Sequence, residues 1–276
     1  MQTTTPMVNG DPNRTAGLLV SVQNEGELRI ALRAGVRWID VKDPSRGALG
    51  CPEIDIATGI QRTMMLENTA DIHFSVALGE LSETPLNDLI HYTGSFADTA
   101  VFKIALSNCC NRTDWRGLAT TLAKGIGNPN RLILVHYADA KESAAPSWCE
   151  ILRTAREIGS EYLLIDTWGK NGRSLLDFYS VEALQSMIAE ANALGFRVAI
   201  AGSLPLETLR SLASLGADWI GVRGAVCDGP HRTGSICETK VRIALAKLSK
   251  PFADPYGLHV QRSSQKIQSN TAGANL

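Results

Sequence analysis

The sequence predicts an α/β protein of the (β/α)8 barrel class with a single domain. The chain has 276 residues, which suits a barrel of roughly 200–250 residues with two short ends left over. Short β-branched runs alternate with longer stretches of helical period, which is typical of βα units around a parallel sheet. No G-x-G-x-x-G motif follows the first expected strand, and its absence weakens the alternative of an open dinucleotide-binding sheet.

Eight strand candidates follow one another along the chain: residues 18–22, 38–41, 72–77, 100–104, 132–136, 162–165, 197–201 and 219–222. Amphipathic stretches lie between them, and the most distinct are residues 25–34, 115–123, 148–158, 181–194, 206–215 and 238–248. Several of these stretches end at a glycine, the residue that tolerates the left-handed conformation just past a helix. These glycines are Gly35, Gly159, Gly195 and Gly216.

The two ends of the chain differ in composition from its middle. Residues 1–16 are rich in Thr, Asn, Pro and Gly, and residues 251–276 are rich in Ser, Gln and Asn. We therefore expect polar tails at 1–16 and 251–276 around a catalytic barrel domain at 17–250.

Composition also excludes several functional classes. The 27 basic and 28 acidic residues give a net charge of -1 without a basic run, so we expect no nucleic-acid partner. No apolar stretch approaches the roughly 20 residues of a membrane helix, and no secretory signal is visible, so we expect no membrane partner and a cytoplasmic location. The cysteines lack C-x-x-C spacing and no His, Asp or Glu cluster has ligand spacing, so we expect neither a metal nor a cofactor.

Charged residues occur at three expected strand ends, which in a barrel meet at one mouth, where active sites lie. Asp40 and Lys42 are two residues apart, so they share a face, and alternation with aliphatic neighbours assigns that face to the barrel interior. Lys103 lies in an apolar run, Asp166 ends the sixth strand and Lys170 follows it. The alternative is a set of solvated lysines and a helix-capping aspartate, but the agreement of three strand ends favours catalytic roles.

Small residues follow the seventh and eighth expected strands. Gly202 and Ser203 come after one, and Arg223, Gly224 and Ala225 after the other. Loops after these two strands often hold phosphate in barrels, because glycine lets main-chain N–H groups approach an anion. The sequence therefore predicts a phosphorylated substrate bound by these five residues, although the glycines would also suit simple tight turns.

Lysines crowded into one cavity indicate a particular chemistry. An amine attacks a carbonyl to form a Schiff base, provided that burial and neighbouring ammonium groups lower its pKa enough to leave part of it unprotonated. Nearby carboxylates or a second lysine can then move protons. These groups predict aldol or dehydration chemistry on a sugar phosphate or triose phosphate.

Several phrases of the sequence resemble one known family. They are the stretches at 18–21 (LLVS), 39–50 (IDVKDPSRGALG), 137–140 (YADA), 166–170 (DTWGK), 176–178 (LDF), 201–203 (AGS) and 221–225 (GVRGA). Together they are similar to the (5-formylfuran-3-yl)methyl phosphate synthase family, from about residue 18 to residue 248. The most specific phrase is D-V-K-D-P followed by G-x-L-G.

The resemblance implies a (β/α)8 lyase that condenses two molecules of glyceraldehyde 3-phosphate into the furan precursor of methanofuran, with loss of phosphate and water. It matches Lys42 to the Schiff-base lysine of the family. It matches Lys103 and Lys170 to the other active-site lysines, and Asp40 and Asp166 to the active-site aspartates. The implied partner is a small triose phosphate substrate, and we also expect a homo-oligomer.

The chain departs from the family pattern at two places. His136 stands where the family tends to have a small residue, and Gly79 with Glu80 stands where it tends to have Gly-Asp. Neither departure removes a proposed catalytic group. We assign His136 no catalytic role.

Two other functions fit the same residues. A class I aldolase or a sugar-phosphate isomerase would also use a lysine and a phosphate site, but it would give an acyclic product. A non-catalytic protein that binds a phosphorylated ligand would form no covalent adduct with an aldehyde. Analysis of products and adducts therefore separates the three functions.

Overall fold

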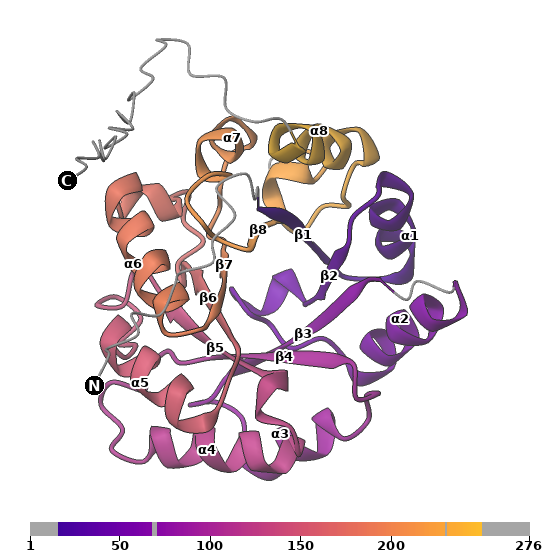
Figure 1. Cartoon of the computed structure of the whole chain (residues 1–276). Coiled ribbons are helices and arrows are strands. Elements are labelled where there is room, and N and C mark those ends of the chain that lie inside the picture. Colours follow the sequence, from indigo (N-terminus) through magenta and orange to yellow (C-terminus); the bar gives the residue numbers. More distant parts are fainter. Residues whose placement is uncertain (1–15, 68–70, 230, 250–276) are drawn as a thin grey trace, which may run out of the picture.

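The computed structural model describes residues 16–67, 71–229 and 231–249. Within them, eight parallel strands close into one barrel in chain order (Figure 1). The strands are β1 Gly17–Val22, β2 Trp38–Val41, β3 His73–Glu80, β4 Ala100–Ala105, β5 Leu132–Tyr137, β6 Tyr162–Asp166, β7 Arg197–Ile200 and β8 Trp219–Val222. The predicted (β/α)8 barrel is confirmed.

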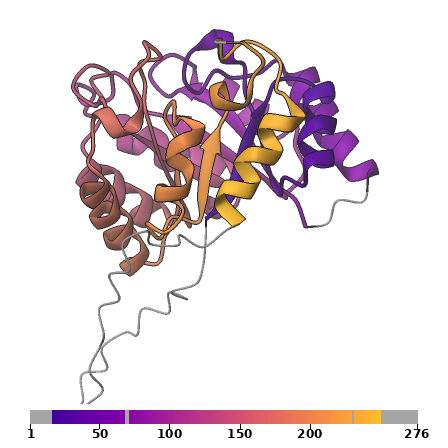
Figure 2. The same ribbon diagram turned by 90° about the horizontal axis from the view of Figure 1, so that it is seen from above.

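Helices cover the outside of the barrel (Figure 2). The α-helices are α1 Glu25–Ala34, α2 Ile54–Leu66, α3 Leu86–Thr93, α4 Trp115–Ile126, α5 Trp148–Ile158, α6 Val181–Ala193, α7 Leu209–Leu212 and α8 Glu238–Ser249. Short 3-10 helices in the described connections are η1 Pro44–Arg46, η2 Pro129–Arg131, η3 Leu175–Asp177, η4 Leu206–Thr208 and η5 Gly224–Val226. None of the described helices has the length and apolar character needed to span a bilayer.

Local signals set the ends of the helices. The side chain of Asn24 accepts a hydrogen bond from the N–H of Glu27 at 2.9 Å, which satisfies one of the unpaired donors at the start of α1. Gly35 ends α1 with a φ of 97°, and Gly159 ends α5 with a φ of 85°. These left-handed positions explain why glycine follows α1 and α5.

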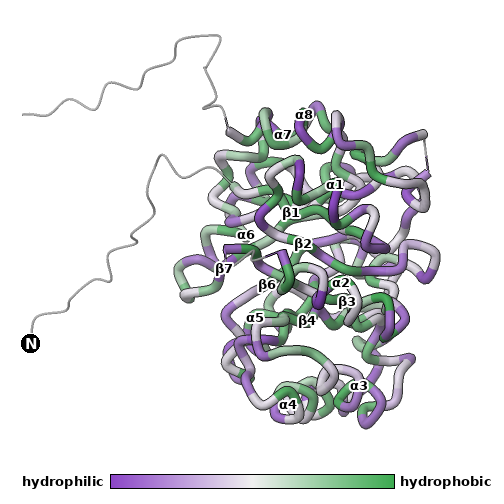
Figure 3. The backbone as a smooth tube through the Cα atoms, turned by 90° about the vertical axis from the view of Figure 1, so that its right-hand side faces the viewer, coloured by the Kyte–Doolittle hydropathy of each residue, from purple (hydrophilic) through white to green (hydrophobic). Residues whose placement is uncertain are grey.

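Alternate side chains of each strand belong to two different cores. Ile39 and Val41 of β2 pack in the large core between the barrel and its helices. Trp38 packs in a smaller core inside the barrel, together with Leu164 and Ala199. Along the helices, hydrophobic and hydrophilic residues alternate (Figure 3), as expected where one side packs on the barrel and the other meets solvent.

Aromatic side chains fill the barrel interior at the amino ends of the strands. We call Trp38, Tyr162 and Trp219 the aromatic floor. The ring centroids of Trp38 and Trp219 are 4.1 Å apart, and those of Trp38 and Tyr162 are 5.9 Å apart. The guanidinium carbon of Arg197 lies 4.3 Å from the ring centroid of Trp219. The floor packs the barrel interior at the end opposite to the carboxyl ends of the strands.

The observed elements differ from the predicted ones mainly at their ends. Strand β3 runs on to Glu80, through an irregularity in its pairing with β4 where Gly79 adopts a φ of 77°. The stretch predicted as one helix at 206–215 contains η4 and the short α7, and the structure adds α2 and α3 to the predicted helices.

Ala16, the last residue of the predicted N-terminal tail, is buried, and its N–H donates to the carbonyl oxygen of Ala213 at 3.2 Å. The other tail residues, 1–15 and 251–276, lie outside the described residues.

Candidate active site

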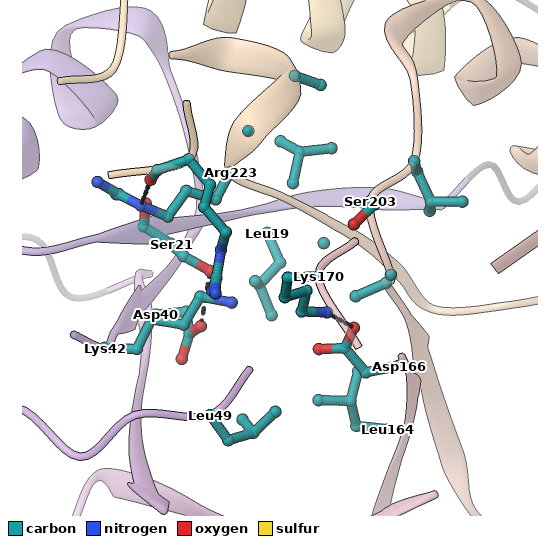
Figure 4. A pocket seen from close by; sticks show the side chains of 18 of the residues that line it. Leu19, Ser21, Asp40, Lys42, Leu49, Leu164, Asp166, Lys170, Ser203 and Arg223 are labelled. Atoms are coloured by element: carbon teal, nitrogen blue, oxygen red, sulfur yellow. Dashed lines mark hydrogen bonds and ion pairs between the residues drawn. The ribbon is translucent and has the colours of Figure 1, made fainter. Parts of the chain in front are cut away.

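The residues predicted for the site all line one cavity, which opens among the carboxyl ends of the strands. Its volume is about 350 Å³, and Figure 4 shows it from close by. The predicted residues in its lining are Asp40, Lys42, Lys103, Asp166, Lys170, Gly202, Ser203, Arg223, Gly224 and Ala225. Strands and loops that are far apart in sequence therefore bring these side chains together.

Asp40 and Lys103 form an ion pair inside the barrel. Only 1% of Asp40 and 3% of Lys103 is exposed. The Asp40 carboxylate also accepts hydrogen bonds from the hydroxyls of Ser21 at 2.8 Å and Ser75 at 3.1 Å. Burial raises the pKa of Asp40, but the ammonium groups of Lys103 and Lys42 more than offset this effect and hold the pKa below its usual value. Asp40 is therefore an ionised, fully bonded carboxylate.

Asp166 and Lys170 form a second pair at the end of β6. Lys170 Nζ donates to Asp166 Oδ1 at 2.9 Å, to the carbonyl oxygen of Thr167 at 2.6 Å and to the hydroxyl of Thr167 at 2.9 Å. These acceptors match the three N–H donors of an ammonium group. Burial raises the pKa of Asp166, but the ammonium groups of Lys170 and Lys42 together have a larger effect in the opposite direction. The pKa of Asp166 is therefore below its usual value. The Asp139 carboxylate accepts the main-chain N–H groups of Trp168 and Gly169, each at 2.7 Å, which fixes the loop between Asp166 and Lys170.

Lys42 differs from both paired lysines. Within the part of the chain that the structure describes, no hydrogen bond or ion pair engages its ammonium group. Figure 4 shows Lys42 and Asp40 on one side of the cavity and Lys170 and Asp166 on the other. Burial lowers the pKa of Lys42 to about 7, against the opposing effect of Asp166 and Asp40. Near neutral pH, a large part of this amine is unprotonated and can attack a carbonyl carbon.

The loop after β2 explains the D-P-x-x-G-x-L-G phrase. The N–H of Asp43 donates to the carbonyl oxygen of Gly50 at 2.9 Å, and the Asp43 carboxylate accepts the N–H of Ser45 at 2.9 Å. A Cβ atom on Gly50 would lie 2.2 Å from the carbonyl oxygen of Asp43, so no other residue fits there. The closed loop also brings Leu49 into the cavity wall, next to the start of the loop at Lys42.

Two turns, after β7 and after β8, also line the cavity. Gly202 has a φ of 112°, and its missing Cβ would lie 3.0 Å from a side-chain carbon of Thr167. Ser203 also has a positive φ, of 50°. Gly224 and Ala225 begin η5, and the first N–H groups of a helix have no partner within it. Exposed N–H groups of this kind bind anions.

The Arg223 side chain, predicted to bind phosphate, instead makes its hydrogen bonds within the protein. Its guanidinium donates to the Glu27 carboxylate at 2.8 and 3.3 Å. It also donates to the carbonyl oxygens of Ser21 at 2.9 Å, Arg232 at 2.7 Å and Gly234 at 3.1 Å. The side chain is therefore fully bonded within the protein, and the main chain of the turn is the part that remains available to a substrate.

Comparison with known proteins gives the family. The 4-HFC-P synthase family matches residues 18–244 of the chain. The chain belongs to this family. A relative from Methanothermobacter thermautotrophicus, named (5-formylfuran-3-yl)methyl phosphate synthase, is 31% identical over 229 residues, which cover 82% of this chain and 95% of the relative. A protein of the same name from Methanobrevibacter smithii is 30% identical over 230 residues, which cover 81% of this chain and 95% of that protein.

Solved barrels share the fold of this member of the 4-HFC-P synthase family. N-(5'-phosphoribosyl)anthranilate isomerase from Pyrococcus furiosus has a TM-score of 0.54 at 14% identity, covering 84% of this chain and 98% of that chain. A 3-hexulose-6-phosphate synthase has a TM-score of 0.51 at 13% identity, covering 83% of this chain and 99% of that chain. At these identities the likeness establishes the fold alone.

Four polar residues beside or in the cavity were not among the predicted site residues. Ser21 and Ser75 lie beside Asp40 in the strand register, and alternation along the strands could have placed both hydroxyls inside the barrel. His231 and Arg232 also line the cavity, and the signal for them is their place in the loop after the eighth strand, at the carboxyl ends of the strands.

His136 lies apart from the chemistry of this 4-HFC-P synthase family member. It alternates with Tyr137 on β5, and its Nε2 is 2.9 Å from the hydroxyl of Tyr179. Its ring also packs against Trp148 of α5, with the centroids 5.4 Å apart. Burial lowers its pKa to about 4, so the ring is neutral. These contacts give His136 a structural role between the barrel and its helices.

Proposed function

We propose that the chain is a (5-formylfuran-3-yl)methyl phosphate synthase. It condenses two molecules of glyceraldehyde 3-phosphate through a Schiff base on Lys42, and supplies the furan precursor of a methanofuran-type cofactor. The observation that carries this proposal is the buried amine of Lys42, which has no partner among the described residues and a pKa of about 7, between two carboxylate–lysine pairs. The names of the relatives support the choice of product.

The reaction begins when Lys42 Nζ attacks the aldehyde carbon of the first triose phosphate. Loss of water gives the imine, and the protonated imine draws electrons from the neighbouring C–H bond, so that a base removes this proton. The electron pair then expels the phosphate group by elimination, which makes the enzyme a carbon–oxygen lyase. The Asp166 and Lys170 pair faces Lys42 across the cavity (Figure 4) and supplies groups for these proton transfers.

The second triose phosphate then reacts with the carbon nucleophile formed by elimination. A proton shift from C2 to C1 first converts this second molecule to its ketone isomer, and the new carbon–carbon bond forms at its C2 carbonyl carbon. Its C1 hydroxyl then closes the ring on the carbonyl carbon at C2 of the first triose, and loss of two molecules of water gives the furan. Atom balance requires the loss of one phosphate and two molecules of water from two molecules of substrate. No oxidant or reductant enters this balance, so the residues of the cavity suffice.

Phosphate binding in this scheme uses the turns after β7 and β8. Gly202, Ser203, Gly224 and Ala225 line the cavity there, and main-chain N–H groups of such turns bind phosphate without a cationic side chain. The small residues let the anion approach the backbone closely. Triose phosphates are metabolites of the cytoplasm, so we propose a cytoplasmic enzyme; its expected homo-oligomer is measurable by light scattering.

Borohydride trapping with glyceraldehyde 3-phosphate tests the proposed function. We expect mass spectrometry to find a reduced adduct on Lys42, and purified protein to release inorganic phosphate and a furan chromophore. The Lys42→Ala variant should lose the adduct and at least about 10³-fold in phosphate release, because the covalent path is removed. Lys141→Ala, which changes an exposed lysine outside the cavity, should match the parent chain.

Each other result identifies another function. An acyclic sugar phosphate in place of the furan would indicate an aldolase or isomerase. Absence of any adduct, together with equal phosphate release by Lys42→Ala and the parent chain, would contradict the proposed mechanism and favour a protein that only binds a phosphorylated ligand.

A further inference from the structure

Arg232 is a charged residue of the cavity that the proposed mechanism does not use. It lies in the loop between η5 and α8, and its side chain lines the cavity with Lys42. The other arginine of this wall, Arg223, is neutralised by Glu27. No carboxylate forms an ion pair with Arg232 among the described residues. A partly buried guanidinium without an anion is costly unless a ligand supplies one.

The hydrogen bonds of Arg232 leave one edge of its guanidinium free. Nη1 donates to the carbonyl oxygens of Pro44 at 3.2 Å and Gly47 at 3.0 Å, and Nη2 lies 3.5 Å from the carbonyl oxygen of Ala48. These three contacts use three of the five N–H donors of the group. The remaining two, on Nε and Nη2, have no partner among the described residues. Together they form the planar pair that binds two oxygens of a phosphate or carboxylate.

The charges in the cavity favour an anion at this edge. Lys103 and Lys170 are balanced by Asp40 and Asp166. Arg232 adds a further positive charge, and Lys42 adds another whenever it is protonated. A phosphate monoester carries close to two negative charges at neutral pH, so it would neutralise this excess better than a carboxylate.

We propose that Arg232 binds the phosphate group of one of the two triose phosphates, a proposal that rests on the proposed function. The guanidinium lies beside the loop after β2, where it contacts Pro44, Gly47 and Ala48. The backbone of Arg232 lies in the connection after β8, where a Cβ on Gly224 would lie 3.6 Å from that of Arg232, but its guanidinium reaches the loop after β2. We therefore assign one anion site to this guanidinium and the other to the main-chain N–H groups of the turns after β7 and β8, one for each substrate molecule.

The number of phosphate ions bound per chain tests the proposal directly. Equilibrium dialysis with radiolabelled inorganic phosphate should find two sites in the parent chain and one in Arg232→Met. Arg232→Lys keeps the charge but lacks the planar pair of donors, so it should keep both sites and bind at one of them at least about tenfold more weakly. Arg112→Met is the matched control, because Arg112 is on the loop after β4 and pairs with Asp114 outside the cavity. It should retain two sites.

Steady-state kinetics separate phosphate binding from a purely structural role of Arg232. Binding predicts that Arg232→Met raises the KM for glyceraldehyde 3-phosphate at least about tenfold, with a smaller change in kcat. A role limited to holding the loop after β2 would change kcat and leave two phosphate sites. Two sites of parental affinity in Arg232→Met or Arg232→Lys, or a single site in the parent chain, would overturn the proposal.

The proposed function can fail separately. Suppose that the parent chain forms no adduct and no furan, yet binds two phosphate ions where Arg232→Met binds one. The proposed synthase activity would then be contradicted, while the proposed anion site at Arg232 would be supported.

Discussion

The two ends of the barrel interior differ in almost every property, although the same strands build both. Strand β2 supplies Trp38 to the aromatic floor and Asp40 to the cavity, and β6 supplies Tyr162 to the floor and Asp166 to the cavity. The floor packs rings together, with the guanidinium of Arg197 over the Trp219 ring, whereas the cavity brings lysines and carboxylates together in a small volume. In both strands, only a few residues separate the aromatic side chain of the floor from the carboxylate of the cavity.

This difference shows that stability and chemistry are separated along the barrel axis. Packed rings at the floor bury apolar area, and the indole N–H of Trp38 is satisfied by the hydroxyl of Ser75 at 3.0 Å, which stabilises the fold. The buried, unpartnered Lys42 destabilises it, because burial disfavours the charged form of an amine. Variants at the two ends should therefore change stability and activity in different combinations.

The largest loss of stability is expected for Lys103→Met. This change leaves the buried Asp40 carboxylate without its closest cation, and breaking a buried ion pair costs about 3–5 kcal/mol of stability. Activity should fall at least about 100-fold, because Asp40 also helps to set the charge around Lys42. Chemical denaturation and the furan assay measure the two losses. Loss of stability alone, with normal activity, would contradict a site role for this pair.

A smaller effect, confined to stability, is expected for Trp219→Leu at the aromatic floor. The shorter side chain leaves part of the space beside Trp38 empty and removes the ring under Arg197. Such a change should cost about 2–3 kcal/mol of unfolding free energy. The kcat should stay within about threefold of the parent value, since the floor touches no substrate. A large loss of kcat would show that packing at the aromatic floor affects the geometry of the cavity at the other end of the barrel.

A change in stability of opposite sign is expected for Lys42→Met, which also removes the catalytic amine. The folded pKa of Lys42, about 7, is below the ordinary lysine value of 10.5, so the unfolded chain binds the proton more tightly between these values. Stability of the parent chain therefore rises with pH across this window. The variant lacks this penalty and should gain up to about 4 kcal/mol at pH 7, a gain that shrinks towards pH 10. Denaturation curves at both pH values test this sign, and a gain that grows with pH would refute it.

Much of the fold follows from local patterns. Alternation along β2 assigned Asp40 and Lys42 to the interior because neighbouring side chains of a strand point to opposite faces. Glycines with left-handed conformation ended α1 and α5 where the sequence predicted. These signals act within a few residues, so the sequence displays them directly.

Contacts between distant residues were not predictable in the same way. Glu27 binds Arg223 across 196 positions of sequence, and no period or spacing connects them, so Arg223 looked like a free phosphate ligand. Spacing and periodicity did not separate the three lysines either, and only the family resemblance singled out Lys42. Packing supplies the physical difference, because Lys103 and Lys170 are each held by a carboxylate, whereas the described residues leave Lys42 unpaired.

The aromatic floor also limits the routes by which substrates and products enter and leave the barrel. With rings filling the far end of the barrel, substrates, water, the expelled phosphate and the furan exchange through the loops at the other end. The first phosphate released therefore leaves past the position that the second triose phosphate must reach. Turnover in the proposed reaction should accordingly be slowed by its own by-product, and strongly so when inorganic phosphate accumulates.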